Sequence, residues 1–144
     1  MFKLRAMLLS SALVLGFAAP SAAETVNITL LGVGDVYKFD GGKVRGGMAR
    51  LNAVARAEKA ANPNTLYLFD GDMFSPSLMS GLDKGENMVK LPEIVPFDLA
   101  VPGNHEFDFG PELFMERIKA SKYPWAAINV TKADGSAIDG LGGV

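Results

Sequence analysis

The stretch that decides the fold is Leu66-Tyr67-Leu68-Phe69-Asp70-Gly71-Asp72. Its apolar run predicts a short buried strand, and Asp70-Gly71-Asp72 ends that strand in a turn. Upstream, residues 26–33 alternate apolar and polar side chains before turning fully apolar, which predicts a strand that becomes buried toward its end. Between the two, residues 48–61 carry apolar side chains at helical spacing, and Asn62-Pro63-Asn64 ends the expected helix.

The same alternation continues downstream. Further strands are expected at 99–101 and 125–130, and further helices at 86–94, interrupted by Pro92, and at 111–120. Residues 73–83 are expected to form a loop or a frayed turn, and residues 131–144 are polar and glycine-rich. Strands that alternate with helices predict an α/β fold, with three to four mostly parallel strands, crossover helices and cover on both faces of the sheet.

Residues 1–23 have the pattern of a secretory signal peptide. Lys3 and Arg5 precede an apolar run at 7–19, and Ser21-Ala22-Ala23 supplies small residues for cleavage. The run is shorter than the roughly 20 apolar residues that span a bilayer, so no stable membrane insertion is expected. We therefore expect an exported chain over 24–144, and the absence of cysteine favours a bacterial periplasm over a disulfide-stapled extracellular module.

Composition excludes several classes of protein. With no cysteine, the chain can form neither a disulfide, nor a thiolate zinc site, nor a cysteine nucleophile. A formal net charge of -2 lacks the basic excess that nucleic-acid binding needs. A hydrophobic content of 49% argues against disorder, and a single histidine is few for a metal hydrolase.

Polar residues follow three of the expected strands directly. Asp35, Asp72 and the pair Asn104-His105 each come just after a strand, at intervals of about one βαβ unit, which is roughly 30 residues long. Ligands of parallel sheets bind beyond the carboxyl ends of the strands, so these side chains are expected to meet at one edge. Taken singly, each Gly-Asp pair is more often a turn, and a lone histidine more often has no catalytic role.

Together these residues resemble a known family. Asp35, Gly71-Asp72 and the string Gly103-Asn104-His105-Glu106 resemble the first three motifs of the calcineurin-like metallophosphoesterases. The segments 46–51, 103–110 and 127–130 are similar to the secreted bacterial 5′-nucleotidase branch of that family. The resemblance implies the N-terminal half of a layered αββα sandwich.

The resemblance also implies a site with two divalent metal ions, of which zinc, manganese, iron, cobalt and calcium are candidates. Asp35 would bind the first metal, Asp72 would bridge both, and Asn104 would bind the second. His105 would stabilise the transferring phosphoryl group, with Asp108 orienting its imidazole, so that Asn104 and His105 also contact substrate. Glu106 is the weaker candidate for the partner of His105, and its alternative role is that of a helix-start or loop carboxylate.

Two departures from the family pattern stand out. Tyr37 occupies the position of a usual metal-binding histidine, where it could ligate as a phenolate or pack nearby without ligating. No histidine follows His105, although the family takes further ligands from later histidine motifs. We therefore expect residues 24–144 to be the N-terminal part of a metallophosphoesterase domain, inactive alone, without the C-terminal half and the substrate-binding domain.

Three functions remain open at this point. The first is phosphoester hydrolysis of small nucleotides by the complete protein, in the manner of a 5′-nucleotidase. The second is a non-catalytic exported domain that binds a nucleotide or a metal. The third is a phosphodiesterase acting on a cyclic nucleotide or another phosphoester.

Overall fold

The computed structural model describes residues 24–142. The predicted signal peptide at 1–23 lies outside these described residues. Over 24–142, no helix combines the length and the apolar character needed to cross a membrane.

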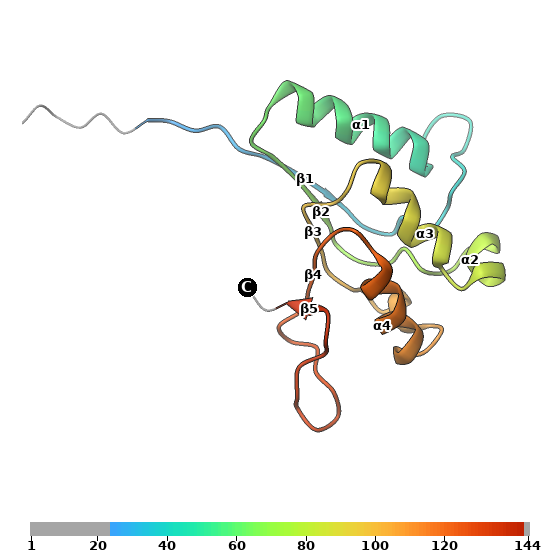
Figure 1. Ribbon diagram of the computed structural model, residues 1–144. Coiled ribbons are helices and arrows are strands. Elements are labelled where there is room, and N and C mark those ends of the chain that lie inside the picture. The colour runs from blue at the N-terminus through green and yellow to red at the C-terminus, as the bar shows by residue number, and fades with distance from the viewer. Residues whose placement is uncertain (1–23, 143–144) are drawn as a thin grey trace, which may run out of the picture.

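A single parallel sheet organises the chain (Figure 1). Its strands follow one another across the sheet in the order β1-β2-β3-β4-β5, and every neighbouring pair is parallel. β1 and β2 share the longest register, from Thr29 opposite Thr65 to Val33 opposite Phe69. The strands are β1 (Thr29–Val33), β2 (Thr65–Phe69), β3 (Leu99–Ala100), β4 (Trp125–Ala126) and β5 (Leu141–Gly142). The α/β class is confirmed, with five strands where three to four were predicted.

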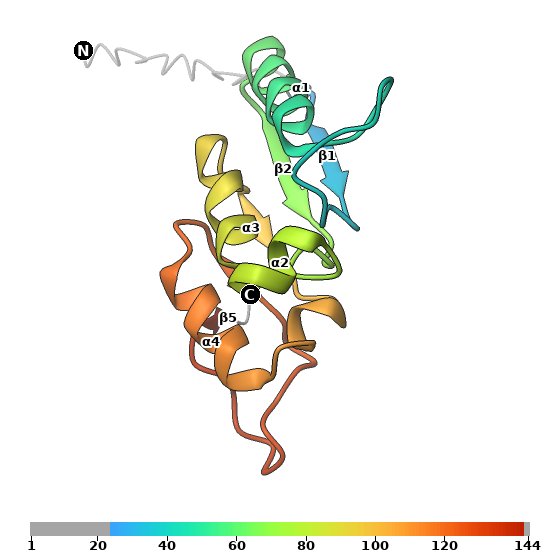
Figure 2. The same ribbon diagram turned by 90° about the vertical axis from the view of Figure 1, so that its right-hand side faces the viewer.

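Helices connect these strands. They are α1 (Met48–Ala61), α2 (Leu78–Asp83), α3 (Glu86–Lys90) and α4 (Pro111–Ala120), with 3-10 turns η1 (Leu91–Ile94) and η2 (His105–Phe107). All the α-helices lie on one face of the sheet (Figures 1 and 2). The prediction of cover on both faces is therefore wrong for residues 24–142. Strands added in one direction by right-handed crossovers place every connecting helix on the same side.

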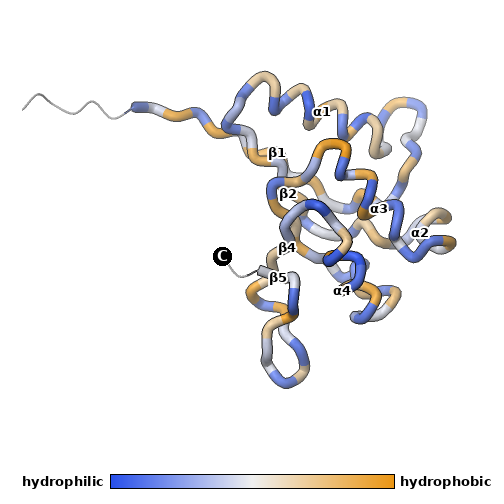
Figure 3. The backbone as a smooth tube through the Cα atoms, in the orientation of Figure 1, coloured by the Kyte–Doolittle hydropathy of each residue, from blue (hydrophilic) through white to orange (hydrophobic). Residues whose placement is uncertain are grey.

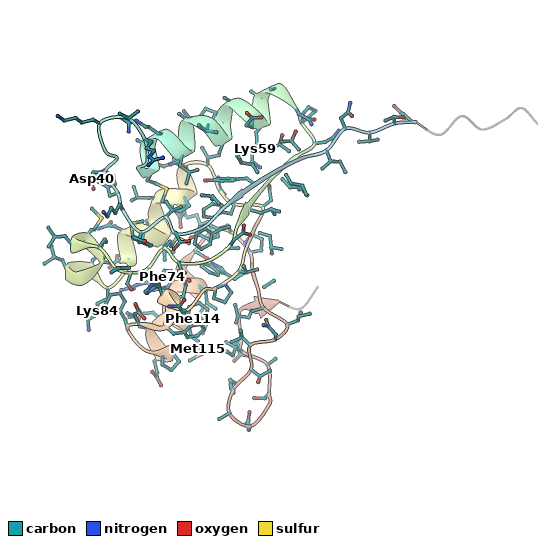
Figure 4. The ribbon with its side chains drawn as sticks, turned by 180° about the vertical axis from the view of Figure 1, so that it is seen from behind. Asp40, Lys59, Phe74, Lys84, Phe114 and Met115 are labelled. Atoms are coloured by element: carbon teal, nitrogen blue, oxygen red, sulfur yellow. The ribbon has the colours of Figure 1, made fainter. Side chains whose placement is uncertain are left out.

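The core lies between this helical layer and the sheet. Tyr67 and Phe69 of β2 point into it and are almost fully buried. Phe69 stacks on Phe97 with ring centroids 5.1 Å apart and meets Trp125 edge-on at 6.1 Å. Phe74, from the loop after β2, lies beside Phe114 of α4, with centroids 6.2 Å apart (Figure 4). This aromatic cluster ties the loop after β2 to the rest of the core.

The opposite face of the sheet carries apolar side chains without helical cover. Leu30 of β1 is 67% exposed and Leu66 of β2 is 44% exposed, whereas their strand neighbours Leu31 and Tyr67 turn toward the helices. In the hydropathy view, β1 contains both pale and orange segments (Figure 3). The expectation that β1 becomes fully buried near its end is wrong, because one face of the strand stays open.

Other expected elements differ in extent. Residues 78–83, expected as loop, form α2, which begins at a reciprocal Ser77–Ser80 capping box. The helix expected at 86–94 divides into α3 and η1, with Pro92 in the first turn of the latter. The strand expected at 125–130 ends at Ala126, and part of the glycine-rich segment returns as β5.

Candidate functional site

Three loops meet at the carboxyl edge of the sheet. Asp35 follows β1, Asp72 follows β2, and Asn104 and His105 follow β3. The amide of Asp35 donates a hydrogen bond to the carbonyl of Gly71, 3.0 Å away, which joins the first loop to the second. The sequence prediction that consecutive βαβ units bring these segments together therefore agrees with the backbone.

The second and third loops touch backbone to backbone. A Cβ on Gly71 would lie 2.5 Å from the amide nitrogen of Gly103, and a Cβ on Gly103 would lie 2.2 Å from Oδ1 of Asp72. Only glycine fits at either position. Asp35 and Asp72 themselves adopt positive φ angles of 55° and 69°. Non-glycine residues held in this region concentrate at functional sites, which makes both turns notable.

Glu106 is fully buried and binds both loops. Its Oε2 accepts hydrogen bonds from the amides of Asp72 at 2.8 Å and Gly103 at 2.7 Å. Its Oε1 accepts from the amides of Met73 at 2.7 Å and Phe74 at 3.2 Å. One carboxylate thus satisfies backbone donors from two segments about one βαβ unit apart.

A second carboxylate spans the same junction in the opposite direction. Oδ1 of Asp72 accepts a hydrogen bond from the backbone amide of His105, 3.0 Å away. Asp72 therefore reaches from the second loop to the third, while Glu106 reaches from the third to the second. The two carboxylates interlock the loops.

His105 forms a pair with Asp108. The imidazole Nδ1 lies 2.7 Å from Oδ2 of Asp108, and this hydrogen bond raises the pKa of His105 above its ordinary value. In return, hydrogen bonds from His105 and from Ser75 lower the pKa of Asp108. The Ser75 hydroxyl donates to Asp108 Oδ2 and lies 3.3 Å from His105 Nδ1. Asp108, not Glu106, is therefore the neighbour of the imidazole.

The Tyr37 ring lies beside His105. The centroids of the two rings are 6.3 Å apart and the rings meet edge to face. The phenol thus lies close to the imidazole of the third loop. A hollow of about 550 Å³ opens between this first loop and α1, with Asp35, Tyr37, Lys38 and Arg45 in its wall.

The predicted metal ligands supply some, but not all, of the donor atoms that a divalent cation needs. Asp35, Asp72 and Asn104 offer two carboxylates and an amide, donors of the kind that hard divalent cations prefer. Asn104 is exposed, and within residues 24–142 its side chain makes no hydrogen bond. Across the same residues, no three histidine, aspartate or glutamate side chains converge on one point. The donors therefore fit a divalent cation in kind but fall short of a full ligand set.

The contacts of two residues in the site, Ser75 and Glu106, are not predicted by the sequence. Ser75 lies three positions beyond Asp72, and nothing in its neighbourhood indicates contact with Asp108. For Glu106 the sequence predicts either a weaker partner of the adjacent histidine or a helix-start or loop carboxylate, whereas the structure shows its carboxylate accepting four hydrogen bonds from backbone amides of two loops. The one available signal was a second acidic residue in the segment 103–108, close to the Asp108 that the resemblance pairs with the imidazole.

The fold and these loops define an α/β protein with an acidic, imidazole-bearing site at the carboxyl edge of its sheet. The family model for the calcineurin-like phosphoesterases matches residues 28–140, and the chain belongs to this family. The predicted resemblance is thereby confirmed. Enzymes of this family use divalent metal ions.

Individual relatives agree with this assignment. The chain is 30% identical to human 5′-nucleotidase over 90% of this chain and 25% of that protein. It is 25% identical to the trifunctional nucleotide phosphoesterase YfkN of Bacillus subtilis, over 82% of this chain and 9% of the relative. The chain thus spans about a quarter or less of the length of these relatives.

A solved structure shares the fold. NAD nucleotidase (NadN) of Haemophilus influenzae matches with a TM-score of 0.70 at 21% identity, over 79% of this chain and 25% of that chain. At this identity the likeness concerns the fold alone. It supports the parallel sheet with its layer of helices as the fold of this chain.

Proposed function

We propose that this chain carries part of the active site of an exported, metal-dependent phosphoester hydrolase that acts on nucleotides. The observation that carries the proposal is the interlocked pair of loops after β2 and β3, which presents Asp72 beside a His105–Asp108 pair. The 5′-nucleotidase names of several relatives support a nucleotide as the substrate class. The predicted signal peptide supports export, with the periplasm as the proposed compartment.

In this proposal Asp35, Asp72 and Asn104 hold the divalent metal ions, and Tyr37 remains a candidate ligand on the first loop. When bound, such metals lower the pKa of a water molecule and neutralise phosphate charge. The remaining ligands come from elsewhere in a longer protein of which this chain is the N-terminal part. The coverage of only a quarter of human 5′-nucleotidase supports that arrangement.

His105 acts on the phosphoryl group. Asp108 accepts the hydrogen bond of Nδ1, which fixes the ring orientation and keeps the proton on that nitrogen. Nε2 is the second donor of the protonated ring, and within residues 24–142 it makes no hydrogen bond. It can donate to a phosphoryl oxygen or give its proton to the leaving oxygen, because the raised pKa favours the protonated form. The exposed Asn104 amide offers a further contact for substrate.

Manganese titration by calorimetry tests the proposal on this chain. We expect Mn²⁺ binding that Asp72→Asn weakens at least tenfold, whereas Asp134→Asn, in the exposed loop after β4, leaves the affinity unchanged. A parallel phosphate-release assay with AMP is expected to show little turnover by the chain alone. Equal Mn²⁺ affinity in the wild type and Asp72→Asn would overturn the assignment of Asp72. No Mn²⁺ binding by the wild type would favour a non-catalytic domain instead.

A further inference from the structure

Glu106 has no role in the proposed reaction, although it lies next to His105 in the sequence. It is 0% exposed, and no cation lies among its hydrogen-bond partners in residues 24–142. A buried carboxylate without a cation is costly unless other donors compensate for the lost water. Here all the compensation comes from backbone amides of the two loops that flank the site.

The partners of Glu106 are the backbone of the site itself. Asp72 and Met73 form the turn that presents the Asp72 carboxylate, and Gly103 immediately precedes Asn104. Because Oε2 is shared between the amides of Asp72 and Gly103, that single oxygen fixes how far apart the two loops lie. The separation is short, since the Gly71 and Gly103 backbones already leave no room for a Cβ.

We propose that Glu106 is a positioning residue that sets the separation between the Asp72 carboxylate and the Asn104–His105 segment. It touches neither substrate nor metal and acts through the backbone of both loops. This inference rests on the proposed function in one respect: the loop separation matters because a divalent cation is proposed to bind between the loops. The contacts that support it are present whatever the reaction is.

Glu106→Gln is the discriminating substitution because it changes the shape of the side chain very little. Glutamine keeps one acceptor oxygen and replaces the other with an NH₂ group, a donor. That NH₂ group would face two backbone amides, which are donors too, and the loops would have to separate locally. Glu93→Gln is the matched control, since Glu93 is a largely buried carboxylate in η1 that pairs with Lys122.

Two measurements test the proposal. By hydrogen exchange, the amides of Asp72, Met73 and Gly103 are expected to lose at least tenfold protection in Glu106→Gln, while the sheet amide of Val101 keeps its protection. By Mn²⁺ calorimetry, the affinity is expected to fall about 10- to 100-fold, the usual effect of removing a residue that orients metal ligands. Glu93→Gln should change neither quantity.

The outcomes separate this inference from the proposed function. Wild-type Mn²⁺ affinity in a folded Glu106→Gln variant would overturn the positioning role and leave the proposed function standing. No Mn²⁺ binding by the wild type would instead overturn the function, and the exchange data would then decide whether Glu106 holds the loops. If the variant does not fold, exchange in the wild type decides: rapid exchange of the Met73 and Gly103 amides would refute the contacts.

Discussion

The close approach of Gly71 to Gly103 makes a quantitative prediction for Gly71→Ala. Gly71 has a φ of +98°, and an added Cβ would lie 2.5 Å from the backbone nitrogen of Gly103. Left-handed backbone costs a non-glycine residue about 1–2 kcal/mol. Overpacking of a tight contact adds about 1–3 kcal/mol. The free energy of unfolding should therefore fall by about 2–5 kcal/mol, a large part of the roughly 5–15 kcal/mol of a typical domain.

Two other glycines separate these contributions. Gly135 has a φ of +81° but nothing within 4 Å of an added Cβ, so Gly135→Ala should show the backbone cost alone, about 1–2 kcal/mol. Gly81 lies in α2 with open space around it and no positive φ. Gly81→Ala should therefore leave stability unchanged or raise it by up to about 1 kcal/mol.

Urea unfolding followed by the fluorescence of Trp125 provides the assay, since this residue is the one tryptophan of the chain and is 3% exposed. With a denaturant dependence of about 2 kcal/mol per molar, the midpoint of Gly71→Ala should fall by about 1–2.5 M. A loss for Gly71→Ala no larger than that for Gly135→Ala would refute the close contact between the two loops.

Further predictions concern the imidazole pair and the two faces of the sheet. The pKa of His105, measured by NMR on the one histidine of the chain, should lie above the ordinary value of about 6.5 and fall toward it in Asp108→Asn. Because the pKa of His105 is raised in the folded state, the pair with Asp108 contributes its full stabilisation below the pKa that His105 has in the unfolded chain. This stabilisation is lost as the pH rises through the higher pKa of the folded state. A free energy of unfolding that increases over this pH range would contradict the pair. Ser75→Ala, which removes one of the two hydrogen bonds that lower the pKa of Asp108, should raise the pKa of that carboxyl, and Ser75→Thr, which keeps the hydroxyl, should restore it. On the covered face of the sheet, Phe69→Ala should lower the free energy of unfolding by about 3–5 kcal/mol. On the open face, Leu30→Ala should lower it by less than about 1 kcal/mol, because the Leu30 side chain is 67% exposed. Similar losses for the two variants would indicate that both faces of the sheet are covered.

The sequence was most informative where periodicity reflects burial. Apolar runs located β2 and β3, and helical spacing located α1 and α4, because these elements pack against one another. α2 was missed because Ser75-Pro76-Ser77 and Gly81 are typical of loops, although Ser77 caps the helix. The single covered face was also missed, because it follows from strand order, which local patterns do not contain.

The candidate site was predictable in its backbone and less so in its contacts. Residues that follow strands meet because parallel strands end at one edge, and this rule brought the loops of Asp35, Asp72 and His105 together. The role of Glu106 could not be read in the same way. Its partners lie 32–34 residues upstream, apart from Gly103, and they are backbone groups that carry no sequence signature.

Paramagnetic broadening by Mn²⁺ in the ¹H–¹⁵N spectrum of the chain is the most direct test that the three loops form one cation site. We predict that substoichiometric Mn²⁺ selectively broadens the amide signals of Asp35, Asp72 and Asn104, and that Asp72→Asn abolishes this broadening. The exposed loop at 131–137 should be unaffected in both proteins. Broadening confined to other acidic surfaces, or unchanged in Asp72→Asn, would contradict a shared metal site at this edge of the sheet.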